Sequence, residues 1–459
     1  MIKFKGYERL IDTVYRFNQG HIFEYFYQLN HDEKKDFFNE IFQVDFELMK
    51  RLYQMKNDIA SLKLNFEPAP YISFHNTSEE AETYERAKEA GIKYIEKGKT
   101  AILLVAGGQG TRLGFDGPKG MFPVGPVSKK TLFQIFAEKI IKYSQKYRVS
   151  IPWFIMTSRS NHVETVRFFE EKDYFGLNND DVFFFSQNMI PSLDNEGKLI
   201  LENPKKIFMN PDGHGGSLTA LFLSGSLEEM KRRGIETISY FQVDNPIIKI
   251  IDPVFIGFHV LNDSDVSSKA VRKIYPEEKV GVFVRFDDGK IGVMEYFDLS
   301  KDKQILRDSE GRLIFCMGNI AIHLFKRSFI EEINSGINFS LPYHLAKKKI
   351  KAYSKNKNID VDGYKFEKFI FDSLNFSRKS IILEIEREDE FAPIKNKDGL
   401  DSIETAAELM SNLSRKWLLG RGVRIPEEVN VIEISPLLAV EPDDLKHVSI
   451  EAEDKVFLK

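Results

Sequence analysis

Apolar side chains recur every three or four positions over residues 1 to about 65, for example in HIFEYFYQLNHDEKKDFFNEIFQV. This spacing is typical of amphipathic helices. We therefore interpret residues 1–90 as an N-terminal helical region that buries its Phe and Tyr side chains on the next domain. A helical face that binds a partner protein is the alternative interpretation.

Short apolar runs then alternate with helical patterns. The sequence predicts strands at 100–105, 151–158, 181–186, 207–210 and 238–245, and helices at 131–147, 161–171 and 217–233. This alternation predicts an α/β fold with a doubly wound, Rossmann-like sheet that is largely parallel. In that architecture ligands bind beyond the carboxyl ends of the strands.

Three later regions depart from this alternation. Residues from about 266 to 325 are rich in strand patterns and predict a flanking mixed sheet, so that residues 91–378 form one domain. Beyond about 380, a strand, a helix and a β-like tail predict a small C-terminal α+β domain over residues 379–459. The lysine-rich run 347–357 is interpreted as the solvated end of a helix, with an anion-binding site as the alternative.

Composition narrows the class of protein. A chain of 459 residues with 42% hydrophobic and 29% charged residues is typical of a soluble globular protein of two or three domains. The net charge of -4 gives no global basic field for nucleic acid, and no apolar run is long enough to span a membrane. A single cysteine, Cys316, fits a reducing compartment, and we expect a cytoplasmic location.

The most informative segment is LVAGGQGTRLGFDGPKG, residues 104–120, in which an apolar strand leads into a glycine-rich loop. Glycines allow backbone N–H groups to approach a polyphosphate. Arg112 and Lys119 add a guanidinium and an ammonium group for phosphate oxygens. No side chain in the loop looks like a nucleophile, so the loop predicts phosphoryl or nucleotidyl transfer by positioning and charge.

Two other phosphate-binding motifs fit poorly. The sequence Gly98-Lys99-Thr100 precedes a strand, whereas a P-loop follows one, and position 93 is Lys where a P-loop has Gly. The spacing of the loop glycines also differs from the GxGxxG dinucleotide fingerprint.

The loop resembles the GGxGTR…PK motif of sugar-1-phosphate nucleotidylyltransferases. The segments PKGMFPVGPVSKKTLFQ, QNMIPS, PDGHGG, QVDN, VMEYF, GNIAIH, KFEKFIFD and REDEFAPIKN follow in the order seen in UDP-N-acetylhexosamine pyrophosphorylases, from about residue 100 to 440. This resemblance implies a fold of the nucleotide-diphospho-sugar transferase type, with residues 91–378 as the catalytic nucleotidyltransferase domain. The implied reaction converts UTP and N-acetylglucosamine 1-phosphate to UDP-N-acetylglucosamine and pyrophosphate.

The resemblance also implies roles for single residues. The implied catalytic cations are Arg112, Lys119, Lys365 and Lys395. The implied nucleotide-binding residues are Val105, Ala106, Gly107, Gly108, Gln187, Gly213 and Asp244. The implied sugar-binding residues are His214, Glu295, Tyr296 and Asn319. The implied cofactor is Mg²⁺ on Asp244, with water and phosphate as most of the other ligands.

One residue departs from the family pattern. The family has Asn within PDGNGG, whereas this chain has His214, and a GHG sequence resembles UDP-glucose and broad UDP-sugar pyrophosphorylases. Glucose or galactose 1-phosphate is therefore the alternative substrate. A nucleotide-sugar sensor without activity is a remote alternative, because the expected charged residues are all present. The oligomeric state is not predicted.

Overall fold

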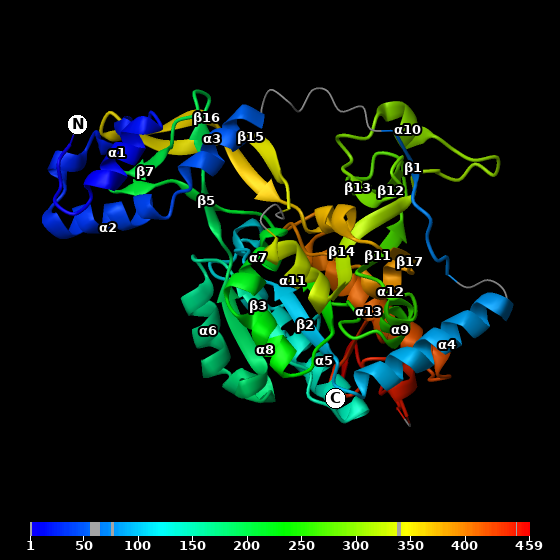
Figure 1. The fold of residues 1–459 in the computed structure, drawn as a ribbon. Helices are drawn as coiled ribbons and strands as arrows, with labels where there is room; N and C mark the ends of the chain where they lie inside the picture. The colour runs from blue at the N-terminus through cyan, green and yellow to red at the C-terminus, as the bar shows by residue number, and fades with distance from the viewer. Residues whose placement is uncertain (1, 56–64, 75–77, 337–340, 447) are drawn as a thin grey trace. The chain divides into compact units, whose positions relative to one another are not determined.

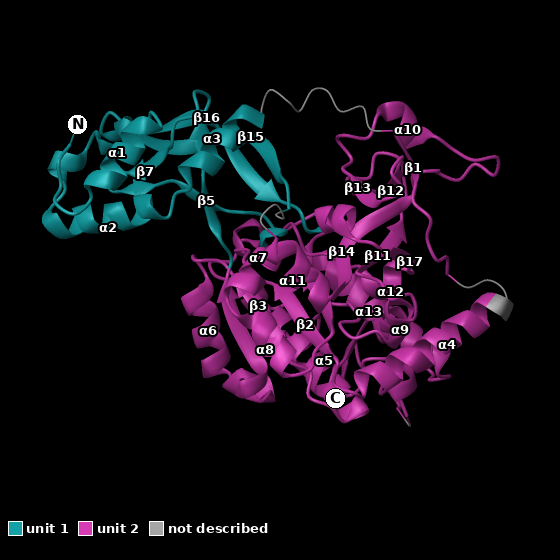
Figure 2. Ribbon diagram, viewed as in Figure 1, with its two compact units in different colours: residues 1–64, 187–216, 341–370 teal, residues 65–186, 217–340, 371–459 magenta. Residues whose placement is uncertain are grey.

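The computed structural model describes residues 2–55, 65–74, 78–336, 341–446 and 448–459. The chain divides into two compact units, each built from segments far apart in the sequence (Figures 1 and 2). Unit 1 comprises residues 1–64, 187–216 and 341–370, and unit 2 comprises residues 65–186, 217–340 and 371–459. Each unit has its own hydrophobic core.

A ten-stranded mixed sheet forms the core of unit 2. Its strands are β1 (Phe66–Pro68), β2 (Thr100–Val105), β3 (Trp153–Thr157), β4 (Val182–Ser186), β10 (Thr237–Gln242), β11 (Val266–Arg272), β12 (Val282–Phe286), β13 (Ile291–Met294), β14 (Met317–Lys326) and β17 (Ser380–Glu384). The order is β1-β12-β14-β10-β2-β3-β4, with β13 beside β12, β11 beside β14 and β17 beside β11. Strands β10, β2, β3 and β4 are parallel, whereas β14 is antiparallel to β10. The expected α/β fold with a mixed sheet is confirmed. The expectation of a largely parallel sheet holds only for β10, β2, β3 and β4, because antiparallel pairs join β1, β11, β12, β13 and β14 to their neighbours, apart from the parallel pair of β11 with β17.

Helices cover both faces of this sheet (Figure 1). The α-helices of unit 2 are α4 (Ser78–Ile95), α5 (Leu132–Tyr147), α6 (His162–Glu171), α7 (Gly216–Leu223, whose first residue belongs to unit 1), α8 (Ser226–Arg232), α9 (Pro253–Leu261), α10 (Lys301–Ile305), α11 (Arg327–Ser335), α12 (Arg387–Glu390) and α13 (Ile403–Gly420). Ile102 and Leu104 of β2 pack with α4, α5, α9 and α13. Leu103, between them, is also buried and points to the opposite face.

Short elements complete unit 2. Its 3-10 helices are η4 (Thr111–Leu113), η5 (Lys119–Met121), η6 (Asp173–Gly176), η7 (Asn179–Asp181), η8 (Ile370–Phe376, whose first residue belongs to unit 1) and η9 (Pro442–Asp444). Near the C-terminus, β18 (Val431–Ile434) pairs in parallel with β19 (Lys455–Leu458). Leu418 of α13 and Ile432 of β18 belong to a small hydrophobic cluster there.

The register of the sheet positions the glycine loop. Val105 pairs with Gln242 in the parallel ladder between β2 and β10. Both strands therefore end at the same edge of the sheet, where the glycine loop leaves β2 and Asp244 follows β10. This is the edge at which ligands bind in open α/β sheets.

Unit 1 combines helices with small antiparallel sheets. Its elements are α1 (Glu8–Arg16), η1 (Gly20–Phe23), η2 (Phe26–Gln28), α2 (His31–Phe42), α3 (Phe46–Gln54), β5 (Met189–Pro191), β6 (Leu193–Asp194), β7 (Leu201–Asn203), β8 (Lys206–Ile207), β9 (Met209–Pro211), β15 (Tyr343–Ser354) and β16 (Lys357–Lys368). Phe37 and Phe38 of α2 share one core with Ile190, Leu193 and Phe366. The N-terminal aromatic side chains thus pack within unit 1, on two segments that the chain supplies much later.

Three expected elements differ in the structure. The lysine-rich run expected at a helix end lies instead in β15 and the following turn, because Ile350 and Ala352 alternate with exposed lysines in the two-residue period of a strand. The helix expected over 217–233 is divided between α7 and α8 at Gly225, whose φ is +76°. The strand expected at 207–210 is divided between β8 and β9, which lie outside the main sheet.

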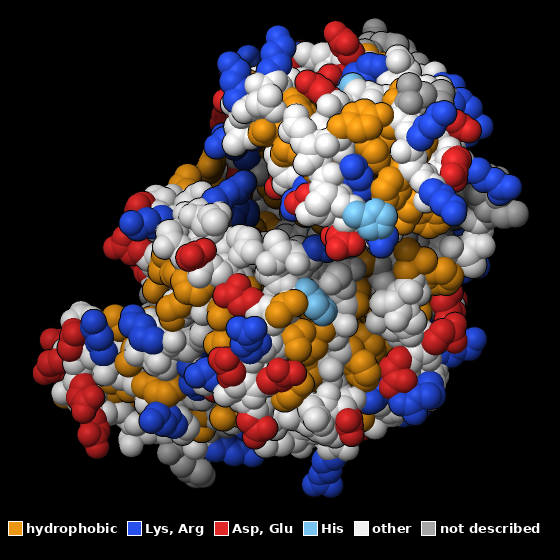
Figure 3. All heavy atoms as spheres, turned by 90° about the vertical axis from the view of Figure 1, so that its left-hand side faces the viewer, with side chains coloured by type: hydrophobic (Ala, Val, Ile, Leu, Met, Phe, Trp, Pro, Cys, Tyr) orange, Lys and Arg blue, Asp and Glu red, His pale blue; other side chains and the backbone are white. Residues whose placement is uncertain are grey.

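The boundaries expected near residues 90 and 378 remain predictions. The β-rich region 266–325 contributes β11, β12, β13 and β14 to the main sheet of unit 2. Among the described residues, no helix is both long and apolar enough to cross a membrane. Acidic and basic side chains are interspersed over the face shown in Figure 3, in keeping with the net charge of -4.

Candidate functional site

The predicted nucleotide-contacting backbone lies at the end of β2. Val105 is the last residue of that strand, and Ala106, Gly107 and Gly108 follow it. The buried side chain of Asn161 supports this turn, because its Nδ2 donates to the carbonyl of Ala106 at 3.0 Å. A Cβ at Gly108 would meet no atom within 4 Å. The turn is therefore fixed from within and open on the side of Gly108, where a ligand can approach the backbone.

Four of the predicted charged residues lie close together in unit 2. Lys119 Nζ is 3.8 Å from Asp244 Oδ2, and their side chains are 15% and 19% exposed. Burial lowers the pKa of Lys119, Asp244 raises it, and the positive charges of Lys395 and Arg112 lower it again. Two cations thus act electrostatically on a shielded lysine. Three cations near one another, with one carboxylate, form a site suited to a polyanion.

The main chain ties Asp244 to the segment that carries Lys395. The carbonyl of Asp244 accepts a hydrogen bond from the N–H of Ile394 at 2.8 Å. Lys395 Nζ lies 3.2 Å from Asp401 Oδ2 and 5.8 Å from the centre of the Phe391 ring. The ammonium group of Lys395 is half-exposed, so a phosphate could reach it.

Asp244 has the chemistry of a magnesium ligand. A carboxylate at a strand end offers the hard oxygen that Mg²⁺ prefers. No group of three or more His, Cys, Asp or Glu side chains in the described part of the chain is arranged to hold a metal ion. The residues therefore fit Mg²⁺ as a single protein carboxylate, with the rest of the coordination sphere left to substrate oxygens and water.

Two predicted sugar-binding residues converge on Gly281, also in unit 2. The N–H of Asn319 in β14 donates to the carbonyl of Gly281 at 2.8 Å. A Cβ at Gly281 would lie 3.2 Å from Glu295 Oε1, just after β13. Tyr296 is exposed and packs edge-on against Phe297. The pairing of β12 with both β13 and β14 brings these residues together.

In unit 1, Gln187 is oriented by its neighbours. Its Nε2 donates to Gly213 O at 2.6 Å and to Asp212 Oδ1 at 3.2 Å. Both amide hydrogens are used, so Oε1 is the atom that can meet a ligand, as an acceptor. Burial raises the pKa of Asp212 to about 6, against the opposing effects of Lys368 and Gln187.

His214 is held in a stack of rings. Its ring is stacked on Phe369, which is stacked in turn on His344, with centroids 5.5 and 4.3 Å apart. The N–H of Ile370 donates to His214 Nδ1 at 3.2 Å. Burial, with a smaller contribution from His344, lowers the pKa of His214 to about 4. The ring is therefore neutral at pH 7, and its proton lies on Nε2, which makes that atom a donor.

Lys365 is placed in the other unit from the remaining predicted cations. It lies in β16 of unit 1, and its Nζ is 5.5 Å from the centre of the Phe208 ring. The predicted site residues thus fall into two groups. Gln187, Gly213, His214 and Lys365 belong to unit 1, and the others belong to unit 2.

Several supporting residues were not predicted. They are Asn161, Asp212, Asn245, Lys368 and Glu390, all of which are buried. All except Asn161 lie within the segments PDGHGG, QVDN, KFEKFIFD and REDEFAPIKN. Their position within these motif segments was the signal that could have identified these four residues, whereas the contacts that they make depend on the fold.

Comparison with known proteins identifies the family to which this chain belongs. Residues 45–452 match the family model described as UTP--glucose-1-phosphate uridylyltransferase. The chain is 37% identical over 391 residues to the UDP-N-acetylglucosamine pyrophosphorylase of Saccharomyces cerevisiae, covering 82% of this chain and 81% of the yeast protein. It is 34% identical over 464 residues to UDP-N-acetylglucosamine diphosphorylase 2 of Arabidopsis thaliana, covering 96% and 91%.

A solved structure of a UDP-N-acetylglucosamine pyrophosphorylase also resembles this chain. The structure of the uridine diphosphate N-acetylglucosamine pyrophosphorylase of Trypanosoma brucei, in complex with an inhibitor, has a TM-score of 0.84 and 28% identity, covering 100% of this chain and 99% of that one. The resemblance inferred from the motifs is confirmed. The chain belongs to the UTP--glucose-1-phosphate uridylyltransferase family and is a nucleotidyltransferase of the UDP-sugar pyrophosphorylase type.

Proposed function

We propose that this protein transfers the uridylyl group of UTP to N-acetylglucosamine 1-phosphate and releases pyrophosphate. The observation that carries the proposal is the group of Arg112, Lys119 and Lys395 around Asp244, beside a glycine turn with open backbone. The names of the yeast and Arabidopsis relatives support the choice of sugar.

The reaction proceeds by in-line displacement. An oxygen of the sugar phosphate attacks the α-phosphorus of UTP, the bond to the bridging oxygen of the β-phosphate breaks, and pyrophosphate leaves on the opposite side. Arg112 and Lys119 hold the triphosphate and neutralise the leaving group, whereas Lys395 holds the sugar phosphate. Lys365 shares the charge that develops between the two substrates. No general base is needed, because the nucleophile is already an anion at pH 7.

Uridine is bound mainly by the backbone. The turn from Val105 to Gly108 lies against the base and ribose, and Gly213 is a further proposed nucleotide-binding residue. Gln187 Oε1 accepts a hydrogen bond from uracil N3–H, since both hydrogens of its amide nitrogen are used inside the protein. Cytosine has no proton on N3, so this contact favours uracil.

Asp244 binds Mg²⁺ in this proposal. When bound, the cation neutralises charge on the triphosphate and fixes its conformation. The carboxylate of Asp244 also faces Lys119, so that the lysine keeps an anionic neighbour before UTP arrives. The cytoplasm is the proposed location, because the single cysteine, Cys316, fits a reducing compartment.

Glu295, Tyr296, Asn319 and His214 bind the sugar. A second candidate substrate, glucose or galactose 1-phosphate, is favoured by His214. Nδ1 of His214 accepts from the N–H of Ile370, so the ring proton is on Nε2, whereas the Asn usual in the family carries both a donor and an acceptor.

Isotopic labelling tests the reaction. With UTP labelled at the α-phosphorus and N-acetylglucosamine 1-phosphate, the label should appear in UDP-N-acetylglucosamine. With UTP labelled at the γ-phosphorus, it should appear in pyrophosphate. Label in orthophosphate, or on the protein, would contradict direct uridylyl transfer.

A further inference from the structure

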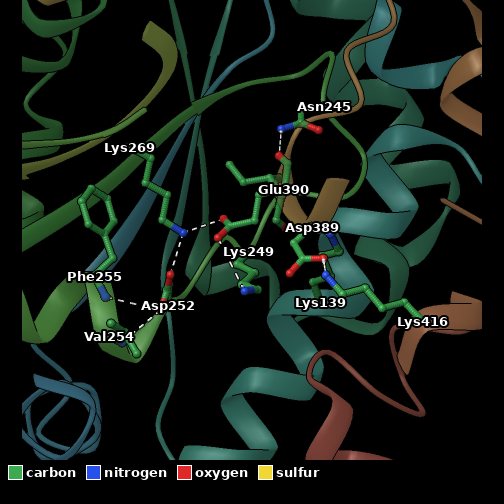
Figure 4. Close-up of polar contacts among 11 residues, drawn as sticks. Lys139, Asn245, Lys249, Asp252, Val254, Phe255, Lys269, Asp389, Glu390 and Lys416 are labelled. Atoms are coloured by element: carbon green, nitrogen blue, oxygen red, sulfur yellow. Dashed lines mark hydrogen bonds and ion pairs between the residues drawn. The ribbon is translucent and has the colours of Figure 1, made fainter. Parts of the chain in front are cut away.

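A cluster of ionised side chains surrounds the buried side chain of Glu390, five residues before Lys395 in the sequence (Figure 4). Lys269 Nζ contacts Asp252 Oδ2 at 2.6 Å and Glu390 Oε2 at 2.5 Å, and Lys249 Nζ lies 3.6 Å from Glu390 Oε1. The side chains of Lys269 and Glu390 are 0% and 2% exposed. Glu390 therefore lies between two lysines on different elements, one in β11 and one in the segment after β10.

Each charge in the cluster has a partner. Burial raises the pKa of Asp252, but Lys269 and Lys249 outweigh this effect and hold it below its usual value. Asp252 also caps α9, because its Oδ1 accepts from the N–H groups of Val254 and Phe255. The cluster is thus anchored in the sheet through Lys269 and in a helix through Asp252.

The main chain of Glu390 is fixed by Asn245, the residue after Asp244. Asn245 Nδ2 donates to the carbonyl of Glu390 at 2.6 Å, and Asn245 Oδ1 accepts from the N–H of Ala392 at 3.0 Å. One amide therefore holds the chain on both sides of Phe391. A carbonyl must accept and an N–H must donate, so these contacts define the orientation of the amide.

Lys139 holds the segment after Asp244 from another side. Its Nζ, on α5, donates to the carbonyls of Pro246 and Ile248 at 2.7 Å each. Together with the contacts of Asn245 and Lys249, this fixes the segment from 244 to 249 through both its side chains and its main chain.

These contacts end at two residues of the proposed site. The carbonyl of Asp244 accepts from Ile394 N–H, one residue before Lys395, and Lys395 Nζ lies over the Phe391 ring. A buried ion pair is in general no more stabilising than an apolar pair of the same size. It does fix geometry strongly, because each charge must meet its partner at hydrogen-bond distance.

We propose that Glu390 is a positioning residue: through its side chain on Lys269 and its main chain on Asn245, it holds Lys395 at a fixed place relative to Asp244. The inference rests on the proposed function, since it takes Lys395 as a group that binds the sugar phosphate. Glu390 touches no substrate and acts only through Lys395.

The test compares Glu390→Gln with Asp389→Asn. Asp389 is the preceding residue of α12 and pairs with Lys416 at 2.6 Å, so its substitution removes an ion pair that includes neither Lys269 nor Asn245. Glu390→Gln should raise KM for the sugar 1-phosphate and lower kcat, with kcat/KM falling about 10- to 100-fold. KM for UTP should change less than about twofold, because the glycine loop is untouched. Asp389→Asn should behave like the unsubstituted protein.

A double-mutant cycle with Lys395→Ala separates positioning from folding. If Glu390 acts through Lys395, the double variant should be no slower than Lys395→Ala alone, within about twofold. Losses that multiply in the double variant would overturn the inference. Normal activity of Lys395→Ala itself would instead overturn the role proposed for Lys395.

Asn245→Ala provides a second variant if Glu390→Gln does not fold. It removes both hydrogen bonds to the 390–392 segment and leaves every charge of the cluster paired. The same rise in KM for the sugar phosphate, again without further loss in combination with Lys395→Ala, is expected. Unchanged KM in folded Asn245→Ala would contradict the inference.

Discussion

Lys119 is the residue on which the proposed chemistry depends most directly. It is shielded from solvent, paired with Asp244 and repelled by Lys395 and Arg112. A bound triphosphate would relieve this repulsion, because it brings several negative charges to a site with an excess of cations.

We predict that Lys119→Ala lowers kcat by about 10²- to 10³-fold, the range seen when one group that stabilises a developing charge is removed. Initial rates of pyrophosphate release measure the effect. Lys231→Ala, which removes an exposed lysine from α8, is the matched control and should keep full activity. Circular dichroism checks that both variants are folded. A kcat within twofold of normal in Lys119→Ala would refute its role.

His214 is predicted to set the choice of sugar. His214→Asn should raise the ratio of kcat/KM for N-acetylglucosamine 1-phosphate to that for glucose 1-phosphate by about 10-fold, because the amide adds an acceptor, whereas the acceptor nitrogen of the imidazole is bonded to Ile370 N–H. An unchanged ratio would show that other residues select the sugar.

The protonation of His214 should not affect this choice near neutrality. Its pKa is lowered to about 4, so the ring stays neutral as the pH rises from 5.5 to 8. The ratio of the two kcat/KM values in the unsubstituted protein should therefore be constant over that range. A step in the ratio near pH 6.5, absent from His214→Asn, would contradict the neutral ring.

At the scale of elements, α4 and α9 cross with their backbones in contact. A Cβ at Gly257 would lie 1.7 Å from Ala87 O, and one at Gly91 would lie 1.8 Å from Pro253 O. Gly257→Ala should therefore force the helices apart and lower the free energy of unfolding by about 1–3 kcal/mol. Gly420→Ala in α13, where a Cβ meets no atom within 4 Å, is the control and should be neutral or slightly stabilising. Equal melting temperatures for both variants would contradict the close crossing.

The sequence predicted secondary-structure elements well where the apolar residues followed one clear pattern, either a continuous run or helical spacing. Strands β2, β3, β4 and β10 and helix α5 follow from apolar runs and helical spacing, and the structure has them within a few residues of the expected positions. The β15–β16 hairpin was not predicted. Its many lysines leave only Ile350 and Ala352 as buried alternating positions in β15, too few to indicate a strand. Such a pattern shows only one buried face, and the partner strand that buries it is unknown from sequence.

For the candidate site, the sequence predicted the motif residues but not the contacts that support them. The motifs predicted the residues expected to contact substrate, and Asp244, Lys395 and Arg112 all act electrostatically on Lys119. Supporting contacts could not be predicted, since Asn245 contacts Glu390, which lies 145 positions later in the sequence. Spacing in the sequence gives no information on such contacts; only the folded sheet brings them together.

For the whole molecule, the two units are each assembled from three separate segments of the chain. The chain enters unit 1 twice from unit 2, at 187–216 and at 341–370, and each passage carries predicted site residues. Ending the chain between residues 216 and 341 would therefore remove Lys365 and the 341–370 segment of unit 1.

The lowered pKa of Lys139 should be detectable in the pH dependence of the free energy of unfolding. Burial lowers its pKa from 10.5 to about 7, with Glu390 opposing the shift. Between these two pH values the unfolded lysine holds a proton that the folded lysine has lost, so unfolding takes up a proton and a rise in pH favours the folded state. Relative to Lys139→Met, the free energy of unfolding should rise by up to about 1 kcal/mol per pH unit above pH 7. Parallel stability curves for the two proteins would contradict the lowered pKa.

Sugar selectivity tests the central claim most directly. Initial rates of pyrophosphate release are measured with saturating UTP and Mg²⁺, and with N-acetylglucosamine, glucose or galactose 1-phosphate in turn. The proposed function predicts that pyrophosphate is released with N-acetylglucosamine 1-phosphate. The kcat/KM for this substrate should be at least about 10-fold above the values for glucose and galactose 1-phosphate. A preference for glucose or galactose 1-phosphate, or no release with any of the three, would contradict it.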